Sequence, residues 1–188
     1  MSLTDKTYFL YPPCEIPITD SSNGYSASLV EKENTRINLS INIYEREYLK
    51  LILGEELYAD YILDTKKDSI DREQKWVNFE HQLLSFNEVI SETVTLKTSP
   101  IACYIYCNYM IDNELNITQK ATATNDKSQN QTVRSNYPFI KKAWDIMVSY
   151  NYTIVEWLLE NKDEFEIDDK EYNRNGMVYL LKPQTYGI

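Results

Sequence analysis

The segment SPIACYIYCNYMI, residues 99–111, decides the fold. Ser99 and Pro100 signal a helix start, because a serine side chain can accept hydrogen bonds from the free amides of a first turn and proline is tolerated at the first helical position. From Ile101 to Ile111 every residue is apolar except Asn108. A helix that is apolar on all sides must be covered on all sides, and this run is too short to cross a bilayer. The segment therefore predicts a central core helix. Its expected core residues are Ile101, Tyr104 and Ile105.

A second long helix is predicted from Pro138 to about Asn161. Apolar residues recur there at helical spacing, and Asn151 is the one polar member of the stripe. The apolar members are Ile140, Ala143, Trp144, Met147, Ile154, Val155 and Leu158. We expect Trp144, Met147 and Leu158 to face the core.

The connection between these helices, residues 116–135, consists almost entirely of Asn, Gln, Thr, Ser, Lys and Ala, and has no aromatic residue. Two helices of a bundle are usually joined by about 2–8 residues, so this loop is longer than the link requires. Two interpretations stay open. The composition favours a disordered connection, whereas the excess length favours a hairpin or tongue that orders on assembly.

Towards the N-terminus, the apolar run Tyr8–Tyr11 is stopped by Pro12 and Pro13, which predicts an edge strand or an arm lying on a surface. The chain then reads as loop through residue 34, with one possible helical turn at 27–31. A helix is predicted to begin near Asn42 and to be interrupted by Gly54, which we expect to act as a terminator or a bend.

The chain resumes as helix at 55–63 and again at about 71–86, where Trp76, Phe79, Leu83 and Leu84 form the expected buried stripe. Residues 87–98 hold no single period, so strand and loop both stay open. Residues 177–181, between Gly176 and Pro183, predict a strand.

These elements predict one mainly α domain over residues 1–188. We expect a small bundle of four to five helices with a long polar loop or hairpin and short strand-like terminal segments. Residues 1–40 would form an N-terminal arm and loop, residues 41–161 the helical core, and residues 162–188 a C-terminal tail.

The composition excludes several classes of function. The formal net charge is −10, which disfavours a nucleic-acid surface because phosphates would be repelled. Three cysteines fit a reducing compartment better than a disulfide framework. The first residues lack the apolar stretch of a signal peptide, so no export is expected. Sixteen tyrosines are typical of protein contact surfaces, although an AT-rich bacterial or phage genome would also favour this residue.

No catalytic, cofactor-binding or metal-binding constellation is visible. The single histidine, His81, lies within a predicted helix and is expected to be structural. Cys103 and Cys107 share a helix face, but a zinc site would need two more ligands, and no nearby pair of cysteines or histidines supplies them. We expect buried, reduced thiols. Glycine is scarce, and phosphate-binding loops and hydrolase motifs are missing from the sequence. We therefore expect no enzyme and no cofactor.

The segment ILGEELY, residues 52–58, resembles the "LGxxLY" helix-break-helix of head–tail connector proteins from tailed bacteriophages and prophages, particularly those of Bacteroidetes hosts. The later order of a core helix, a Thr/Ser/Asn-rich loop and a long helix containing KKAW at 141–144 is also similar, so the resemblance covers about residues 40–160. It implies a helical adaptor that forms a ring beneath the portal and joins capsid to tail. In such proteins the loop between the last helices projects and contacts neighbours. The resemblance assigns this contact role to Thr118, Lys120, Thr122, Thr124, Asn125, Lys127, Gln129, Gln131 and Thr132.

The expected function is therefore that of a structural virion protein, assembled in the bacterial cytoplasm. Its partners would be copies of itself, the portal and tail-completion proteins, with no sequence-specific nucleic acid and no membrane. Two alternatives remain. One is a bacterial cytoplasmic module that binds a single protein partner through its Tyr-rich surface. The other is an enzyme whose site is assembled from scattered carboxylates.

Overall fold

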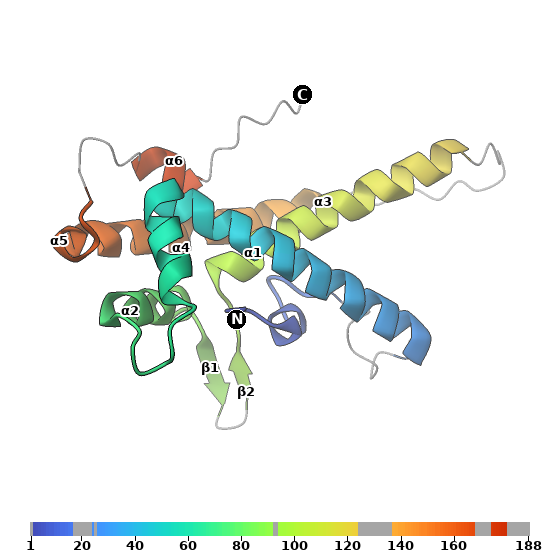
Figure 1. Cartoon of the computed structure of the whole chain (residues 1–188). Helices are drawn as coiled ribbons and strands as arrows, with labels where there is room; N and C mark the ends of the chain where they lie inside the picture. Colours follow the sequence, from blue (N-terminus) through green and yellow to red (C-terminus); the bar gives the residue numbers. More distant parts are fainter. Residues whose placement is uncertain are drawn as a thin grey trace.

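The computed structural model describes residues 2–16, 24, 26–91, 94–123, 137–167 and 174–179. Over these ranges the chain is mainly helical, which confirms the predicted fold class (Figure 1). The elements in order are the 3-10 helix η1 (Lys6–Phe9), α1 (Ala27–Asp64), α2 (Gln74–Leu83), β1 (Glu88–Ser91), β2 (Val94–Leu96), α3 (Pro100–Ala123), α4 (Tyr137–Glu160), α5 (Lys162–Phe165) and α6 (Arg174–Tyr179).

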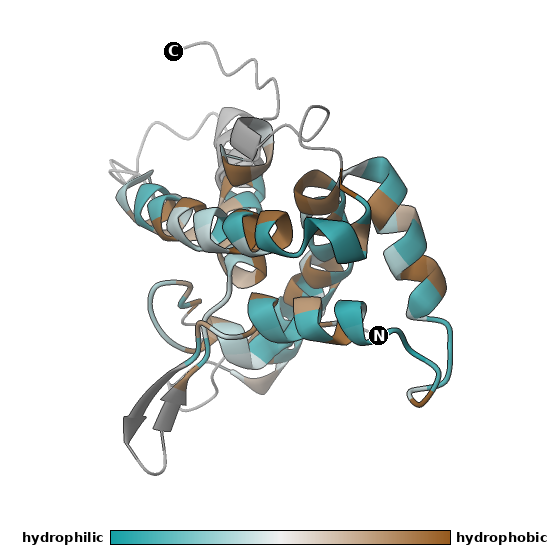
Figure 2. Ribbon diagram, turned by 90° about the vertical axis from the view of Figure 1, so that its left-hand side faces the viewer, coloured by the Kyte–Doolittle hydropathy of each residue, from teal (hydrophilic) through white to brown (hydrophobic). Residues whose placement is uncertain are grey.

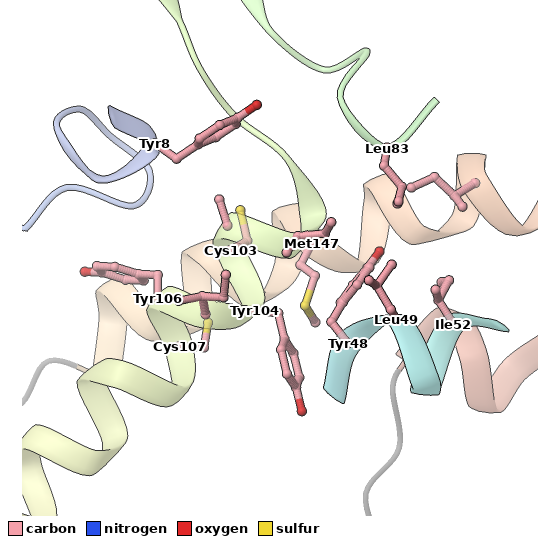
Figure 3. Packing of buried hydrophobic residues seen from close by; sticks show 14 of the residues in the cluster. Tyr8, Tyr48, Leu49, Ile52, Leu83, Cys103, Tyr104, Tyr106, Cys107 and Met147 are labelled. Carbon is pink, nitrogen blue, oxygen red and sulfur yellow. The ribbon is translucent and has the colours of Figure 1, made fainter. Parts of the chain in front are cut away.

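The core is built around the first half of α3. The Ala102 amide donates to Ser99 Oγ at 3.1 Å, so the serine caps the helix as its sequence predicts. All residues from Ile101 to Cys107 are buried. Figure 3 shows this part of α3 between α1, α4 and the N-terminal segment that carries Tyr8. An apolar helix is stable here because neighbouring elements cover every side of it.

Helix α4 runs antiparallel to α3 and presents its apolar stripe to it. Ala143, Met147, Ile154, Val155 and Leu158 are buried, as predicted. Ile140 and Trp144 are only half-buried and pack at the margin of the core. Trp144 is thus a boundary residue of the core.

Asn151 shows why a polar residue belongs in that stripe. Its Oδ1 accepts a hydrogen bond from the Tyr48 hydroxyl at 2.6 Å, and its Nδ2 donates to the Val178 carbonyl at 3.0 Å. The side chain is fully buried. Because buried polar groups are costly when unpaired, this amide fixes α1, α4 and α6 relative to one another.

Helix α1 begins at Ala27, so the predicted start near Asn42 and the predicted loop through residue 34 are wrong. The first half of α1 is rich in charged and polar residues, which hid its periodicity. Tertiary contacts stabilise it, because Ile37 and Ile41 are buried on its inner face. The N-terminal arm and loop therefore end before Ala27. The bend at Gly54 is confirmed: its φ of 77° and ψ of 170° interrupt the helical path, in a region of φ that favours glycine.

The N-terminal segment is held against α1 by a buried carboxylate. Glu45 accepts hydrogen bonds from the Leu3 and Thr4 amides, each at 3.0 Å, and from the Ser2 and Thr4 hydroxyls, each at 2.8 Å. These contacts hold residues 2–4, whereas Tyr8 and Phe9 of the predicted surface arm are buried in the core. The alternative of an edge strand is wrong, because Tyr8 and Phe9 belong to η1, which is capped by the Asp5 side chain.

The terminal strand predicted for residues 177–181 is also wrong. Met177 and Val178 lie in the short helix α6, whose packing on α4 and α1 overrides the local strand preference. Residues 180 and 181 lie outside the described ranges. Strand pairing occurs instead at residues 87–98. There β1 and β2 pair antiparallel, with Glu88 opposite Leu96, and their hairpin extends below the helices in Figure 1.

The third predicted helix is α2, shorter than expected at both ends. Trp76, Phe79 and Leu83 are buried as predicted, and Leu84 is half-buried. Hydrophobic and hydrophilic residues are interspersed along the helices, as Figure 2 shows. Among the described residues, no helix combines the length and apolar character needed to cross a membrane.

Candidate assembly surface

Helix α3 extends into the segment predicted to be a loop. Thr118, Lys120 and Thr122 lie in this helix, which ends at Ala123, so a loop beginning at residue 116 is wrong. Alanine, glutamine and lysine are good helix formers, and an existing helix is easily extended by them. The remaining candidate residues fall outside the described ranges. They are Thr124, Asn125, Lys127, Gln129, Gln131 and Thr132.

The outer end of α3 runs past the described start of α4. Cys107 lies opposite the Ile140 carbonyl, with its Sγ 3.5 Å from that oxygen, and α4 begins only three residues earlier, at Tyr137. Two contacts with α1 follow: Tyr44 bonds to Asp112, and Arg36 bonds to Asn113. The next ten residues of α3 extend for about 15 Å, and Figure 1 shows them as the yellow end at the upper right.

An apolar groove lies at the base of this outer end, where the N-terminal segment meets α3 and α4. Its volume is about 400 Å³. Its lining residues are Pro12, Pro13, Glu15, Tyr106, Met110, Phe139 and Lys142. Of its lining residues, Phe139 is 63% exposed. Two further exposed aromatic residues are close in sequence to lining residues: Tyr11, next to Pro12, is 51% exposed, and Tyr137, two residues before Phe139, is 64% exposed. We call the groove and these three residues the aromatic surface.

The lining of the aromatic surface is mainly apolar and aromatic, with few charged groups. Burial raises the pKa of Tyr106 to about 12, so its hydroxyl stays protonated. Glu15 and Lys142 are the charged side chains of the groove, and both are exposed. Tyrosine, phenylalanine and methionine are enriched at protein–protein contacts, where they bury large areas. The sequence indicated such contacts through its tyrosine count, but it could not place them together.

The predicted core residues lie away from this surface or beneath it. Ile101, Tyr104, Ile105, Met147 and Leu158 are buried, and Trp144 is half-buried. These residues belong to the packed core, beyond which the outer end of α3 extends.

The cysteines are buried together. Cys14 Sγ lies 3.4 Å from Cys103 Sγ, and Cys107 is one turn further along α3. The contact with Cys103 and burial raise the pKa of Cys14, and burial raises that of Cys107, so these thiols are poor nucleophiles at neutral pH. Sequence spacing could not pair Cys14 with Cys103.

His81 is exposed on α2. In the described part of the chain, no three His, Cys, Asp or Glu side chains are placed to hold a metal ion.

An ionic cluster joins α1 to α2. The Asp64 carboxylate is buried and accepts from the Glu73 amide at 2.9 Å and from Arg72 Nε at 3.0 Å. Arg72 also makes a bidentate pair with Glu80, at 2.8 and 3.0 Å. Burial acts to raise the pKa of Asp64, but these hydrogen bonds and Lys67 lower it on balance.

No protein-family model matches the chain, and neither a curated protein nor a solved structure matches it. The function must therefore be inferred from the surface itself.

Proposed function

We propose that this chain is a structural virion protein, a head–tail connector subunit that multimerises between the portal and the tail. It acts by binding and performs no chemistry. The observation that carries the proposal is the aromatic surface at the base of a helix that extends beyond the packed core. Exposed aromatic residues beside an apolar groove supply the contact area that an assembly protein needs.

Two further features support the proposal. The bend at Gly54 falls within the segment that resembles connector proteins, at the position where the resemblance has its helix break. The backbone of α3 continues for ten residues beyond Asn113, past the described start of α4, where a neighbouring subunit or the portal could reach it. The location in a virion, after assembly in the bacterial cytoplasm, follows from the proposal.

Electron microscopy of the purified chain mixed with the portal of the phage or prophage that encodes it tests the proposal. We expect rings of additional density at the tail-facing side of the portal. Replacing both Tyr137 and Phe139 by Ser should remove that density without unfolding the chain, because both side chains are exposed. Tyr152→Ser is the matched control, since Tyr152 is also exposed on α4, at 52%, but does not line the groove.

A portal that stays bare at saturating concentrations of the chain would contradict the connector function. If the chain instead formed a stoichiometric complex with one bacterial protein through the same aromatic surface, it would be a cytoplasmic binding module. In both cases, loss of binding in the Tyr137→Ser/Phe139→Ser variant would show that the binding is specific to the aromatic surface, whereas unchanged binding would indicate nonspecific adhesion.

A further inference from the structure

The basic residues of α1 are confined to the part of the helix before Gly54. Before Gly54 the helix contains four basic residues, and these are all the basic residues of α1: Lys32, Arg36, Arg46 and Lys50. After Gly54 it contains only acidic charges, at Glu55, Glu56, Asp60 and Asp64. The same part of the helix also carries Glu31, Glu33, Glu45 and Glu47, so its formal charge is balanced, and any concentration of positive charge must lie on one face of it.

The four basic residues also share one face of the helix. Together with Leu39 and Ile43 they follow alternating spacings of three and four residues, which place all six within an arc of about 80° over a length of about 27 Å. All six are exposed, and Leu39 and Ile43 are 61% and 51% exposed. We call this row the basic stripe. It lies opposite the buried face of α1 that carries Ile37, Ile41 and Tyr48.

A complementary hollow lies beyond the bend at Gly54. It has a volume of about 320 Å³, and its carboxylates are Glu55, Glu56, Asp60 and Glu166. Its apolar lining comes from Leu53, Leu57, Phe165, Ile167 and Met177. We call this hollow the acidic pocket. It offers what the basic stripe lacks, namely negative charge around an apolar floor.

The basic stripe and the acidic pocket of one molecule cannot dock on each other, because they occupy successive parts of the same helix. Only their adjoining ends meet, where Lys50 Nζ lies 3.4 Å from Glu55 Oε2. The stripe runs from there towards the lower right of Figure 1, away from α5 and α6, which border the pocket.

We propose that the basic stripe of one copy docks in the acidic pocket of a second copy. This contact joins two different surfaces, so it repeats head to tail and can close into a ring. The inference rests on the proposed connector function, for which it names the contact between subunits. Leu39 and Ile43 would cover the apolar floor of the pocket, while Lys32 and Arg46 would face its carboxylates. Arg36 is already bound to Glu33 and Asn113.

A single contact of this kind is weak. A helix face about 27 Å long and about 10 Å wide covers far less than the roughly 800 Å² per partner that stable complexes bury. Exposed ion pairs add little each and are screened by salt. A closed ring is nevertheless stable, because each subunit is held by two contacts at once. We therefore expect self-association that depends on concentration and decreases with salt.

Sedimentation velocity of the full chain with exchanged charges tests the contact. Lys32→Glu/Arg46→Glu reverses the stripe and avoids Arg36, which pairs with Glu33, and Lys50, which pairs with Glu55. Glu56→Lys/Asp60→Lys reverses the pocket. The matched controls are Lys6→Glu/Lys66→Glu and Asp68→Lys/Asp71→Lys. They change the net charge equally at exposed positions outside both surfaces.

Wild-type chain and both controls should form larger species as concentration rises to about 0.5 mM at low salt, where weak contacts become populated. Each reversed variant alone should remain monomeric. An equimolar mixture of the two reversed variants should associate again, because each stripe then finds a pocket of opposite charge on the other variant.

Three results would overturn the inference. The first is a wild-type chain that stays monomeric over this range. The second is equal loss of association in the controls, which would indicate a net-charge effect. The third is failure of the mixture to associate although circular dichroism shows both variants folded. Salt-sensitive binding of a monomeric wild type to anionic vesicles, lost in Lys32→Glu/Arg46→Glu, would assign the stripe to a lipid surface instead. These measurements need only the purified chain, so they can fail or succeed independently of portal binding.

Discussion

The two halves of α3 belong to one continuous helix but are stabilised differently. In the first half, residues 101–107 are buried on every side, against α1, α4 and the N-terminal segment. The second half leaves the core after the contacts of Asp112 and Asn113 with α1 and continues to Ala123. The first half is a helix because its surroundings require one, whereas the second is an extension that depends on helix propensity. Stability and assembly can therefore be changed separately.

The largest effect is expected from shortening a side chain in the first half. Ile105→Ala should lower the free energy of unfolding by about 2–5 kcal/mol, because it removes buried methyl groups and leaves a cavity. Urea denaturation measures the loss. Leu63→Ala is the control, since Leu63 is 61% exposed and its truncation should cost less than about 0.5 kcal/mol. Equal losses in the two variants would show that the first half of α3 is not the centre of the core.

Asn151→Ala tests whether the interior also depends on a polar contact. The change leaves the Tyr48 hydroxyl and the Val178 carbonyl without this partner, so we expect a loss of about 1–3 kcal/mol. Asn38→Ala, at an exposed position of α1, is the control. A stable Asn151→Ala variant would mean that water replaces the amide and that α6 is not held by it.

A third test concerns the ionic cluster of Asp64, Arg72 and Glu80 between α1 and α2. The pKa of Asp64 is lowered below its ordinary value of 3.8. The carboxylate therefore contributes stability above pH 3.8, and this contribution is lost as the pH falls through the lower pKa of the folded state. Asp64→Asn should lower the free energy of unfolding by about 1–3 kcal/mol at pH 7. The difference in this free energy between the variant and wild type should become smaller in acid. Asp145→Asn, in an exposed pair with Lys141, should have little effect at either pH. A difference for Asp64→Asn that is independent of pH would exclude this ionic contribution.

The smallest effect on stability is expected from the outer end of α3. Replacing Lys120 through Gln131 by a short Gly/Ser link should leave the melting temperature nearly unchanged, because polar residues bury little apolar area. Shortening a connection also lowers its closure entropy slightly. The same replacement should abolish incorporation into connector rings. Unfolding of this variant would place the segment in the core, and normal particles would make it only a link.

Much of the fold could be predicted because local patterns agreed with their surroundings. Ser99 caps α3, the stripe of α4 faces the core, and Trp76 and Phe79 are buried, since each pattern follows the period of its helix. The errors occurred where local preference and packing disagreed. The start of α1 is polar, and residues 177–178 favour a strand, yet both are helical because α1, α4 and α6 pack together.

The candidate surfaces could be predicted only in part. The tyrosine content indicated contacts, but Pro12, Met110 and Phe139 are far apart in the sequence and meet only where three elements converge. The spacing of the basic residues of α1 was present in the sequence. It became interpretable only when the helix was seen to begin at Ala27, because the basic residues share a face only if the whole segment is helical.

The sequence by itself determined the helical class, the cap at Ser99, the bend at Gly54 and the apolar faces, because these depend on the geometry of a few neighbouring residues. Only the tertiary structure decided where α1 begins, that Glu45 holds the N-terminal segment, that Cys14 meets Cys103, and that an apolar groove lies beside the outer end of α3. Those features arise from contacts between residues distant in the chain, and the free energy of burial that fixes them is absent from any local pattern.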